Sequence, residues 1–330
     1  MAGDSFAAVG TTPVDRSTTW PYEDGEPGRF TYSRFSGPTL VEAESRLAAL
    51  DGGDALLFSS GAAACTAVVL ALLGPGQTVA IAEGAYYGTG VMLDELARWG
   101  IEKVEFDQTA APPDGVDLVW LEAPSNPFLT MPSFEAAAAH PARVVCDSTA
   151  ATPLNVRPLE LGCDLAVHSA TKYLAGHDDA LIGAVVCKRA EDVARLLEFR
   201  SRTGPVPAAD TAWLLLRGLE TLEIRMARQS ESAGLITERL RRHPAVETVR
   251  YPGFGGLLSF DVADADAARR VETSTELVVN ATSLGGVTSR IESRARWEGA
   301  RVPGGLLRLS IGLEDPGALW LDLERALDTL

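Results

Sequence analysis

One lysine, Lys172, lies between an apolar, strand-like run and a glycine in the segment Ala166-Val-His-Ser-Ala-Thr-Lys-Tyr-Leu-Ala-Gly-His177. The hydroxyl residues Ser169 and Thr171 stand beside it. Chemistry at the Cα of an amino acid needs an amine that forms a Schiff base with an aldehyde cofactor, and hydroxyls that hold a phosphate nearby. A lysine after a strand is more often an ordinary loop residue, so matches elsewhere in the chain must decide between the two interpretations.

A second segment, Phe58-Ser-Ser-Gly-Ala-Ala-Ala-Cys65, opens an apolar run that continues to Leu73 and predicts a helix. Gly61 and Ala62 then fall at its N-terminus. Free backbone N–H groups and the helix dipole favour a phosphate there, and small side chains let it approach. Because Ser-Gly before a helix is usually only an N-cap, this signal is weak when taken alone.

Polar residues also follow two further strand-like runs. Asn126 lies in Glu122-Ala-Pro-Ser-Asn-Pro127, directly after one run, and Asp147 ends the run 142–147. Open α/β sheets bind ligands at the carboxyl ends of their strands. A turn and a helix cap are the alternative interpretations. With Lys172 one βα unit further on, Asp147 is placed to keep a pyridine nitrogen protonated.

In this order the motifs resemble those of the pyridoxal-phosphate enzymes of cysteine and methionine metabolism, the cystathionine γ-synthase and γ-lyase group. The resemblance covers nearly the whole chain. It rests on Tyr32-Ser-Arg34, Ser60-Gly-Ala62, Tyr86 with Gly88-Thr89, Glu122–Pro127, Asp147–Pro153, Ser169–Lys172, Ser283-Leu-Gly-Gly286 and Arg308–Asp315. The closing stretch, Ser293-Arg-Ala-Arg-Trp297 followed by Val302–Arg308, is most similar to bacterial members named cystathionine γ-lyases.

The resemblance implies an α/β protein of the fold type I of pyridoxal-phosphate enzymes, which is aspartate aminotransferase-like. Its seven-stranded, mainly parallel sheet carries helices on both faces, and a smaller α+β domain follows. Pyridoxal 5′-phosphate is the implied cofactor and a small amino acid the implied substrate. The implied phosphate site consists of the backbone of Gly61 and Ala62, the hydroxyls of Ser169 and Thr171, and Tyr32 and Arg34 from the neighbouring subunit.

The remaining roles are also carried over from the resemblance. Tyr86 stacks on the cofactor ring and assists the substrate amine or the leaving group, although Tyr87 replaces a usual glycine beside it. Asn126 bonds the cofactor's phenolate oxygen and Asp147 its pyridine nitrogen. Lys172 is both anchor and base. Arg308 clamps the substrate α-carboxylate through paired, charge-assisted bonds, with Ser283 assisting.

Three activities follow as hypotheses. The first is a C–S lyase, cystathionine γ-lyase above all; the second is a γ-replacement synthase joining a homoserine ester to a thiol; the third is a non-catalytic scaffold, against which Lys172, Asp147 and Arg308 speak. Relatives that grip the distal amino group of cystathionine often carry glutamate where this chain has Thr288, which makes Thr288 a candidate substrate-binding residue. Its neutral hydroxyl favours another thioether or an O-acylhomoserine unless Glu292, Arg290 or Arg294 compensates.

Two more departures from the group concern specificity. The methionine γ-lyase subgroup has a cysteine shortly after the stacking tyrosine, and Tyr87-Gly88-Thr89 contains none. Asp178 stands where many relatives have serine. The first departure argues against methionine γ-lyase activity, and the second makes the segment Gly176–Asp179 unusually acidic.

Composition fits a cytoplasmic enzyme without a nucleic-acid or membrane partner. The 330 residues are 46% hydrophobic and carry a formal net charge of −16, with no basic run. Apolar stretches are too short to span a bilayer, and the start lacks the basic residues of a secretory signal. We expect no metal site. The cysteines, which lack metal-binding spacing, are expected to be reduced packing residues: Cys65, Cys146, Cys163 and Cys187.

The pattern of elements divides the chain into an N-terminal arm (1–45), a cofactor-binding large domain (46–205), and a linking helix with a C-terminal α+β domain (206–330). Alternating apolar strands and amphipathic helices predict the large domain's parallel sheet. A helical pattern over 210–242 predicts the link. The arm has no periodicity and needs a surface to lie against. In the group this makes a homodimer obligatory for activity, and a tetramer is common.

Overall fold

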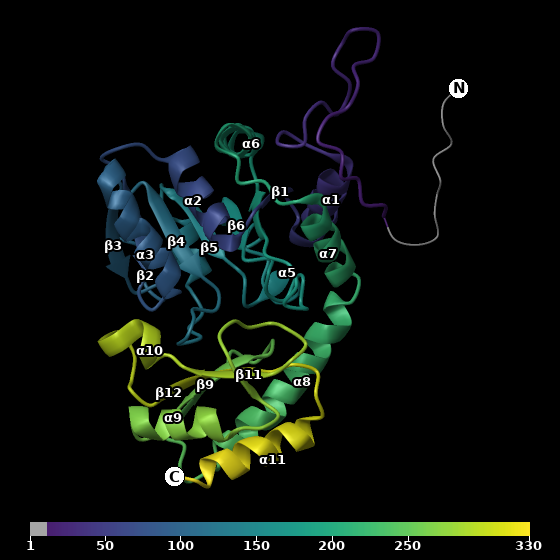
Figure 1. The fold of residues 1–330 in the computed structure, drawn as a ribbon. Coiled ribbons are helices and arrows are strands. Elements are labelled where there is room, and N and C mark those ends of the chain that lie inside the picture. Colours follow the sequence, from purple (N-terminus) through teal and green to yellow (C-terminus); the bar gives the residue numbers. More distant parts are fainter. Residues whose placement is uncertain (1–11) are drawn as a thin grey trace.

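Two β-sheets, one above the other in Figure 1, organise the chain. The structure, a computed structural model, describes residues 12–330. The larger sheet has seven strands in the order β1-β7-β6-β5-β4-β2-β3. These strands are β1 (Asp54–Phe58), β2 (Thr78–Ala82), β3 (Glu102–Phe106), β4 (Leu118–Glu122), β5 (Arg143–Asp147), β6 (Leu165–His168) and β7 (Gly183–Cys187).

The larger sheet is mainly parallel, as predicted. Only β7 runs antiparallel to its neighbours β1 and β6. Strand β3 lies at the edge of the sheet, and its charged residues, such as Glu102 and Glu105, are exposed, so it lacks the apolar run of a buried strand.

Helices cover both faces of this sheet because successive strand residues point to opposite sides. The helices of this part are α1 (Pro38–Asp51), α2 (Gly61–Leu72), α3 (Tyr87–Leu96), η1 (Ala97–Trp99), α4 (Phe134–Ala138), α5 (Thr152–Asn155), α6 (Ala190–Thr203) and α7 (Ala209–Leu219). In β1, Leu56 and Phe58 pack in the cluster that includes α2 and α6, whereas Ala55 and Leu57 pack in the cluster that includes α1 and α7.

The predicted helix over 210–242 is two helices, α7 and α8 (Leu222–Leu240), with a break at residues 220–221. The chain is closely packed beside this break. A Cβ at Gly218 would lie 2.3 Å from the carbonyl oxygen of Ala175, so the end of α7 rests directly on the chain that follows Lys172. The buried Arg225 then donates to the carbonyl oxygens of Gly218 and Tyr173, both at 2.8 Å. The link between the sheets thereby supports the lysine loop.

The second sheet has five strands in the order β10-β11-β12-β9-β8. Its elements are β8 (Thr248–Arg250), β9 (Leu257–Asp261), α9 (Ala265–Ser274), β10 (Val279–Asn280), β11 (Arg290–Ser293), α10 (Ala295–Glu298), η2 (Gly299–Arg301), β12 (Leu306–Ser310) and α11 (Pro316–Leu327). Figure 1 shows α10 facing the larger sheet and α9 and α11 on the far side. The connection between β11 and β12, which contains α10, therefore lies on the side of the second sheet that faces the larger one.

The structure can be compared with the expectations about cysteines, membrane-spanning helices and domain boundaries. The cysteines Cys65, Cys146, Cys163 and Cys187 are buried and free. Within residues 12–330 no helix is long and apolar enough to cross a membrane. The predicted division at residues 45 and 205 stays a prediction, although α1 already begins at Pro38, inside the predicted arm.

Candidate active site

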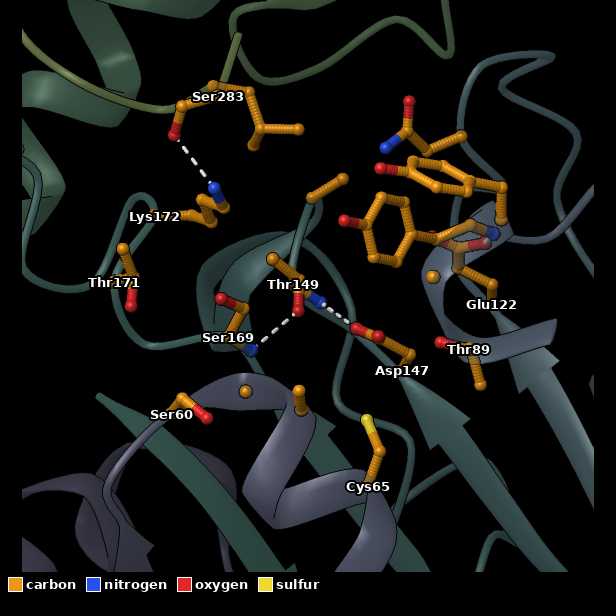
Figure 2. A pocket seen from close by; sticks show the side chains of 18 of the residues that line it. Ser60, Cys65, Thr89, Glu122, Asp147, Thr149, Ser169, Thr171, Lys172 and Ser283 are labelled. Carbon is orange, nitrogen blue, oxygen red and sulfur yellow. Dashed lines mark hydrogen bonds between the residues drawn. The ribbon is translucent and has the colours of Figure 1, made fainter. Parts of the chain in front are cut away.

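Lys172 stands on the tight turn after β6, and its ammonium group donates to Ser283 Oγ at 2.7 Å (Figure 2). Ser283 has φ = 86°, a left-handed conformation that residues other than glycine rarely adopt and that is often found at functional sites. Burial lowers the pKa of Lys172 to about 8, and the charge of Arg308 lowers it in the same direction. The neutral fraction of this amine near physiological pH is therefore far larger than for an exposed lysine, although the protonated form still predominates.

The chain on either side of Lys172 is held by close backbone contacts. The buried ring of Tyr173 lies against Gly285, where a Cβ would be 2.6 Å from the Tyr173 nitrogen. With φ = +79°, Gly285 also needs its conformational freedom. The Tyr173 hydroxyl accepts the N–H of Gly256 at 3.1 Å. These contacts fix Lys172 between the two sheets.

Asp147 ends β5 and points into the same pocket (Figure 2). Burial raises its pKa, and the hydrogen bonds from Thr149 oppose that rise; one of them is the 2.9 Å bond from the Thr149 N–H. The Thr149 hydroxyl in turn accepts the N–H of Ser169 at 2.8 Å. A buried carboxylate that receives hydrogen bonds from Thr149 and, within residues 12–330, no ion pair fits a cationic N–H ligand, which would offset the cost of removing the charge from water.

The N-terminus of α2 closes the opposite side. The Ser60 hydroxyl caps the helix by accepting the N–H of Ala63, which leaves the N–H groups of Gly61 and Ala62 at the open end. A Cβ on Gly61 would lie 2.8 Å from Ser169 Cβ and 2.9 Å from its Oγ. Only glycine therefore lets this backbone approach the lysine turn, and the arrangement fits a phosphate.

Thr171 lines the pocket, but its hydroxyl is already used within the protein. It donates to the Ile182 carbonyl at 3.0 Å and accepts the Ile182 N–H at 2.9 Å. In this arrangement Thr171 joins the lysine turn to the start of β7 and has no proton to offer a phosphate. The predicted phosphate contact of Thr171 therefore requires its side chain to rotate.

Two tyrosines stand at the head of α3, with ring centroids 5.0 Å apart. The Tyr86 N–H donates to Glu122 Oε2 at 2.6 Å, so the end of β4 positions this residue. Burial, reinforced by Tyr87, raises the pKa of the Tyr86 hydroxyl to about 12. The guanidinium carbon of Arg294 instead lies over the Tyr87 ring, 5.5 Å from the centroid of the ring. Tyr86 is thus a protonated hydroxyl at neutral pH.

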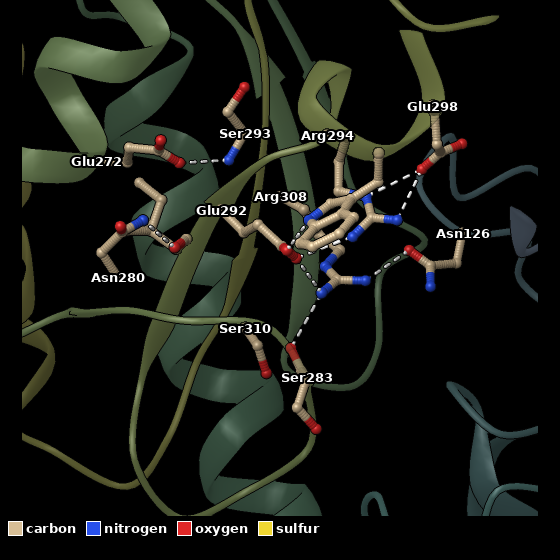
Figure 3. Close-up of polar contacts among 12 residues, drawn as sticks. Asn126, Glu272, Asn280, Ser283, Glu292, Ser293, Arg294, Glu298, Arg308 and Ser310 are labelled. Carbon is tan, nitrogen blue, oxygen red and sulfur yellow. Dashed lines mark hydrogen bonds and ion pairs between the residues drawn. The ribbon is translucent and has the colours of Figure 1, made fainter. Parts of the chain in front are cut away.

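Arg308 projects from β12, and three acceptors hold it (Figure 3). These acceptors are Asn126 Oδ1 at 3.2 Å, the Ser283 carbonyl at 3.1 Å and Glu292 Oε2 at 2.8 Å. Burial lowers the pKa of Arg308 to about 10, which still leaves it charged at neutral pH. Because Asn126 accepts through Oδ1, its amide N–H₂ group stays available as a donor.

The structure thus brings ten of the predicted site residues around one cavity of about 290 Å³. They are Gly61, Ala62, Tyr86, Asn126, Asp147, Ser169, Thr171, Lys172, Ser283 and Arg308. Three residues without a predicted site role also line this cavity: Cys65, Glu122 and Thr149. Arg294 lines it too and Glu292 bonds Arg308, and both were expected only as charges that compensate for Thr288. Glu122 and Thr149 lie inside the recognised motifs, so their place at strand ends could have identified them.

Three predicted residues lie outside this cavity. Tyr32 and Arg34 lie in the arm, where the Arg34 guanidinium packs over the Tyr32 ring at 5.2 Å and bonds the carbonyl of Ser201. Thr288 is half-buried and does not line the cavity, and the hydroxyl of the neighbouring Ser289 bonds Glu314. The geometry of this chain therefore gives no support to a substrate contact by Thr288.

Asp178, the other departure noted in the sequence, has a clear partner. Its carboxylate forms two 2.8 Å bonds with the guanidinium of Arg290 on β11. A Cβ on Gly286 would lie 2.3 Å from the same carboxylate. Asp178 therefore ties the loop after Lys172 to the Ser283–Gly286 turn, and its charge serves this contact.

With this geometry established, comparisons with known proteins define the class. The family model described as Cys/Met metabolism PLP-dependent enzyme matches residues 3–328. The chain belongs to this family of pyridoxal-phosphate enzymes, which cleave or form carbon–sulfur bonds, and pyridoxal 5′-phosphate is its cofactor. The glycine cradle at Gly61, the buried Asp147 and the depressed pKa of Lys172 fit that group.

Individual relatives carry different activities in their names. A Streptomyces coelicolor protein with the provisional name cystathionine gamma-lyase is 38% identical, covering 92% of this chain and 85% of its own. The Mycobacterium tuberculosis (strain H37Rv) cystathionine gamma-synthase is 36% identical, covering 98% and 93%. The crystal structure of metB from Corynebacterium glutamicum superposes with a TM-score of 0.95 at 35% identity, covering 99% and 94%. These comparisons confirm the family and fold type I and leave the exact activity open.

Proposed function

We propose that the protein is a cystathionine γ-lyase, which converts L-cystathionine and water into cysteine, 2-oxobutanoate and ammonia. The choice of a lyase rests mainly on the residues of one wall of the cavity. The stretch Ser293–Trp297, whose sequence is similar to bacterial γ-lyases, contributes Arg294 to that wall. The relative with the provisional name cystathionine gamma-lyase also supports it.

Lys172 is the proposed base. When bound, pyridoxal 5′-phosphate takes up the electrons released as protons leave the substrate. An amine with a pKa of about 8 can remove the Cα proton and release it again near neutral pH. Ser283, at 2.7 Å from the lysine nitrogen, orients that amine toward the substrate.

Tyr86 is the proposed acid for the departing sulfur. With a pKa raised to about 12, the hydroxyl keeps its proton at neutral pH and can donate it as the Cγ–S bond breaks. The Tyr87 ring is already packed against Arg294, so Tyr86 is the better candidate of the two for the reacting end of the pocket.

The remaining predicted residues hold the cofactor and substrate in this proposal. Asp147 binds the pyridine N–H, and its raised pKa would fall once a cationic partner arrives. Gly61, Ala62 and Ser169 receive the phosphate. Arg308 binds the α-carboxylate of the substrate.

We also propose that Tyr32 and Arg34 complete the phosphate site of a second copy of the chain, in a homodimer or a tetramer. Both lie outside the cavity of their own chain. The test mixes the Arg34→Ala and Lys172→Ala variants, each inactive alone. If each site takes Lys172 from one chain and Arg34 from the other, the mixed dimer contains one intact site and activity returns. Unchanged inactivity after subunit exchange, shown by mass spectrometry, would contradict it.

A γ-replacement synthase is the second candidate. It is favoured by the 36% identity to the Mycobacterium tuberculosis cystathionine gamma-synthase. The deciding experiment supplies purified, cofactor-loaded protein with L-cystathionine alone and, separately, with O-succinyl-L-homoserine and L-cysteine. A lyase releases 2-oxobutanoate rapidly in the first reaction. Rapid cystathionine formation in the second reaction, with no 2-oxobutanoate released in the first, would establish the synthase instead.

A further inference from the structure

A buried carboxylate, Glu292 on β11, lies directly behind Arg308 (Figure 3). Only 3% of Glu292 is exposed, so its charge needs protein partners. Its Oε2 accepts from Arg308 Nη2 and from Arg294 Nη1, each at 2.8 Å. Its Oε1 accepts from Trp297 Nε1 at 2.6 Å. Both oxygens are thus committed to protein donors, so Glu292 is not available to grip a distal substrate ammonium.

The pairing of strands makes this contact specific. Glu292 and Arg308 are opposite each other in the antiparallel pair β11 and β12, where side chains on one face lie close together. Arg308 therefore meets the carboxylate without any movement of a loop. The contact depends on strand register and not on sequence proximity.

Arg294 fills the other side of the carboxylate. It is 1% exposed, and its Nε donates to Glu298 Oε1 at 2.9 Å. Its guanidinium also covers the Tyr87 ring and lines the cavity. Arg308, Glu292, Arg294 and Glu298 form an alternating row of charges, which we call the arginine row.

Two buried guanidinium groups repel each other unless an anion separates them. Burial lowers the pKa of Arg308 and the charge of Arg294 lowers it further, whereas Glu292 opposes both effects. An arginine already fixed by protein acceptors also loses less conformational entropy when a ligand binds. Because Glu292 lies between the two arginines, it reduces the repulsion between them and fixes Arg308 before a ligand binds.

We propose that Glu292 is a positioning residue that aims Arg308 at the substrate α-carboxylate, and that Arg294 and Trp297 hold Glu292 in place. The proposal rests on the proposed role of Arg308 and deepens it. The arginine row makes the pocket select a free carboxylate over an amide or ester. It also links carboxylate binding to the Tyr87 ring through Arg294.

Glu292→Gln tests this with little change in volume. Either rotamer of the amide turns an N–H₂ group toward a donor, Trp297 Nε1 on one side or the two arginines on the other, so one contact is always lost. The matched control is Glu272→Gln. Glu272 is also buried and bonds the adjacent Ser293 N–H at 2.6 Å and Arg296, but it has no contact with Arg308.

The measurement is a titration of the cofactor-loaded protein with L-alanine and with L-alaninamide, followed by the visible absorbance of the bound cofactor. We expect Glu292→Gln to raise the dissociation constant of L-alanine about 10- to 100-fold and that of L-alaninamide less than about threefold. Glu272→Gln should change neither. Reverting the substitution to glutamate, in a protein of matched thermal stability, should restore the affinity for L-alanine.

Equal weakening for both ligands, or the same loss in Glu272→Gln, would show general loosening of β11 and overturn the proposal. Unchanged L-alanine affinity in Glu292→Gln would also overturn it, as would a wild-type protein that does not distinguish L-alanine from its amide. Selective loss of L-alanine binding in a protein that releases no 2-oxobutanoate from cystathionine would refute the lyase and leave the role of Glu292 intact.

Discussion

The two halves of the cavity hold their functional groups by different means. On the larger sheet, Lys172, Asp147 and Gly61 are placed by strand ends, a turn and a helix N-terminus, with backbone groups as the main partners. On the second sheet, Arg308 is placed by other buried charges, chiefly Glu292. The first half depends on local backbone geometry, and the second depends on the balance of a charge network.

This difference predicts different responses to substitution. Changes in the first half should affect cofactor binding and the chemical step. Changes in the arginine row should affect ligand carboxylate binding and leave the cofactor in place.

The largest effect is expected for Lys172→Ala. Loss of the anchor and base should reduce kcat by at least about 10⁴-fold and remove the visible absorbance of lysine-bound cofactor. Steady-state assay and the absorbance spectrum check both effects. Lys188→Ala, a surface substitution on the same sheet, should match the wild type; an active Lys172→Ala with an unchanged spectrum would contradict the assignment.

Arg308→Lys should come next. Lysine keeps the charge but cannot make paired planar contacts, so we expect KM for the amino-acid substrate to rise about 10- to 100-fold with a smaller change in kcat. The cofactor absorbance should be retained. Loss of the cofactor from this variant would contradict the separation of the two halves, because Arg308 would then also affect cofactor binding. The absorbance spectrum therefore serves as the control.

Gly61→Ala should act through the cofactor alone. The added Cβ would lie 2.8 Å from Ser169 and would push the helix N-terminus away from the lysine turn. The dissociation constant of the cofactor should rise about tenfold, measured by reloading the apoenzyme, with KM nearly unchanged. Gly90→Ala in α3, where a Cβ meets no atom within 4 Å, is the matched control and should leave cofactor affinity unaltered.

The smallest effect concerns pH. The base must be neutral to accept a proton, so kcat should rise with pH through a midpoint near the Lys172 pKa of about 8. Glu292 raises that pKa, so Glu292→Gln should move the rising limb to lower pH. A pH profile for both proteins checks this, and a shift to higher pH would reverse the electrostatic assignment.

The same division explains what the sequence could predict. Lys172, Gly61 and Asp147 occur in short motifs whose local structure is determined by neighbours in the chain. The arginine row was missed because Arg290-Ile-Glu-Ser293 contains one apolar residue and β11 was not predicted. Without that strand, the opposition of Glu292 and Arg308 has no local signal.

The seven strands that the resemblance implies for the larger sheet are confirmed by the structure. The substrate role of Thr288 rested on one aligned position, whereas its neighbour Ser289 bonds Glu314, which is 25 residues away in the chain. The roles of Tyr32 and Arg34 depend on a second copy of the chain. Residues whose function depends on such long-range contacts cannot be assigned from local patterns.

The central claim is that Lys172 carries the cofactor between the two halves. Borohydride reduction of the loaded enzyme, followed by proteolysis and mass spectrometry, tests it most directly. The account predicts that the reduced cofactor is covalently attached to Lys172, in stoichiometric amount. Attachment to Lys103 or Lys188, or no covalent attachment in a protein that retains activity, would contradict it.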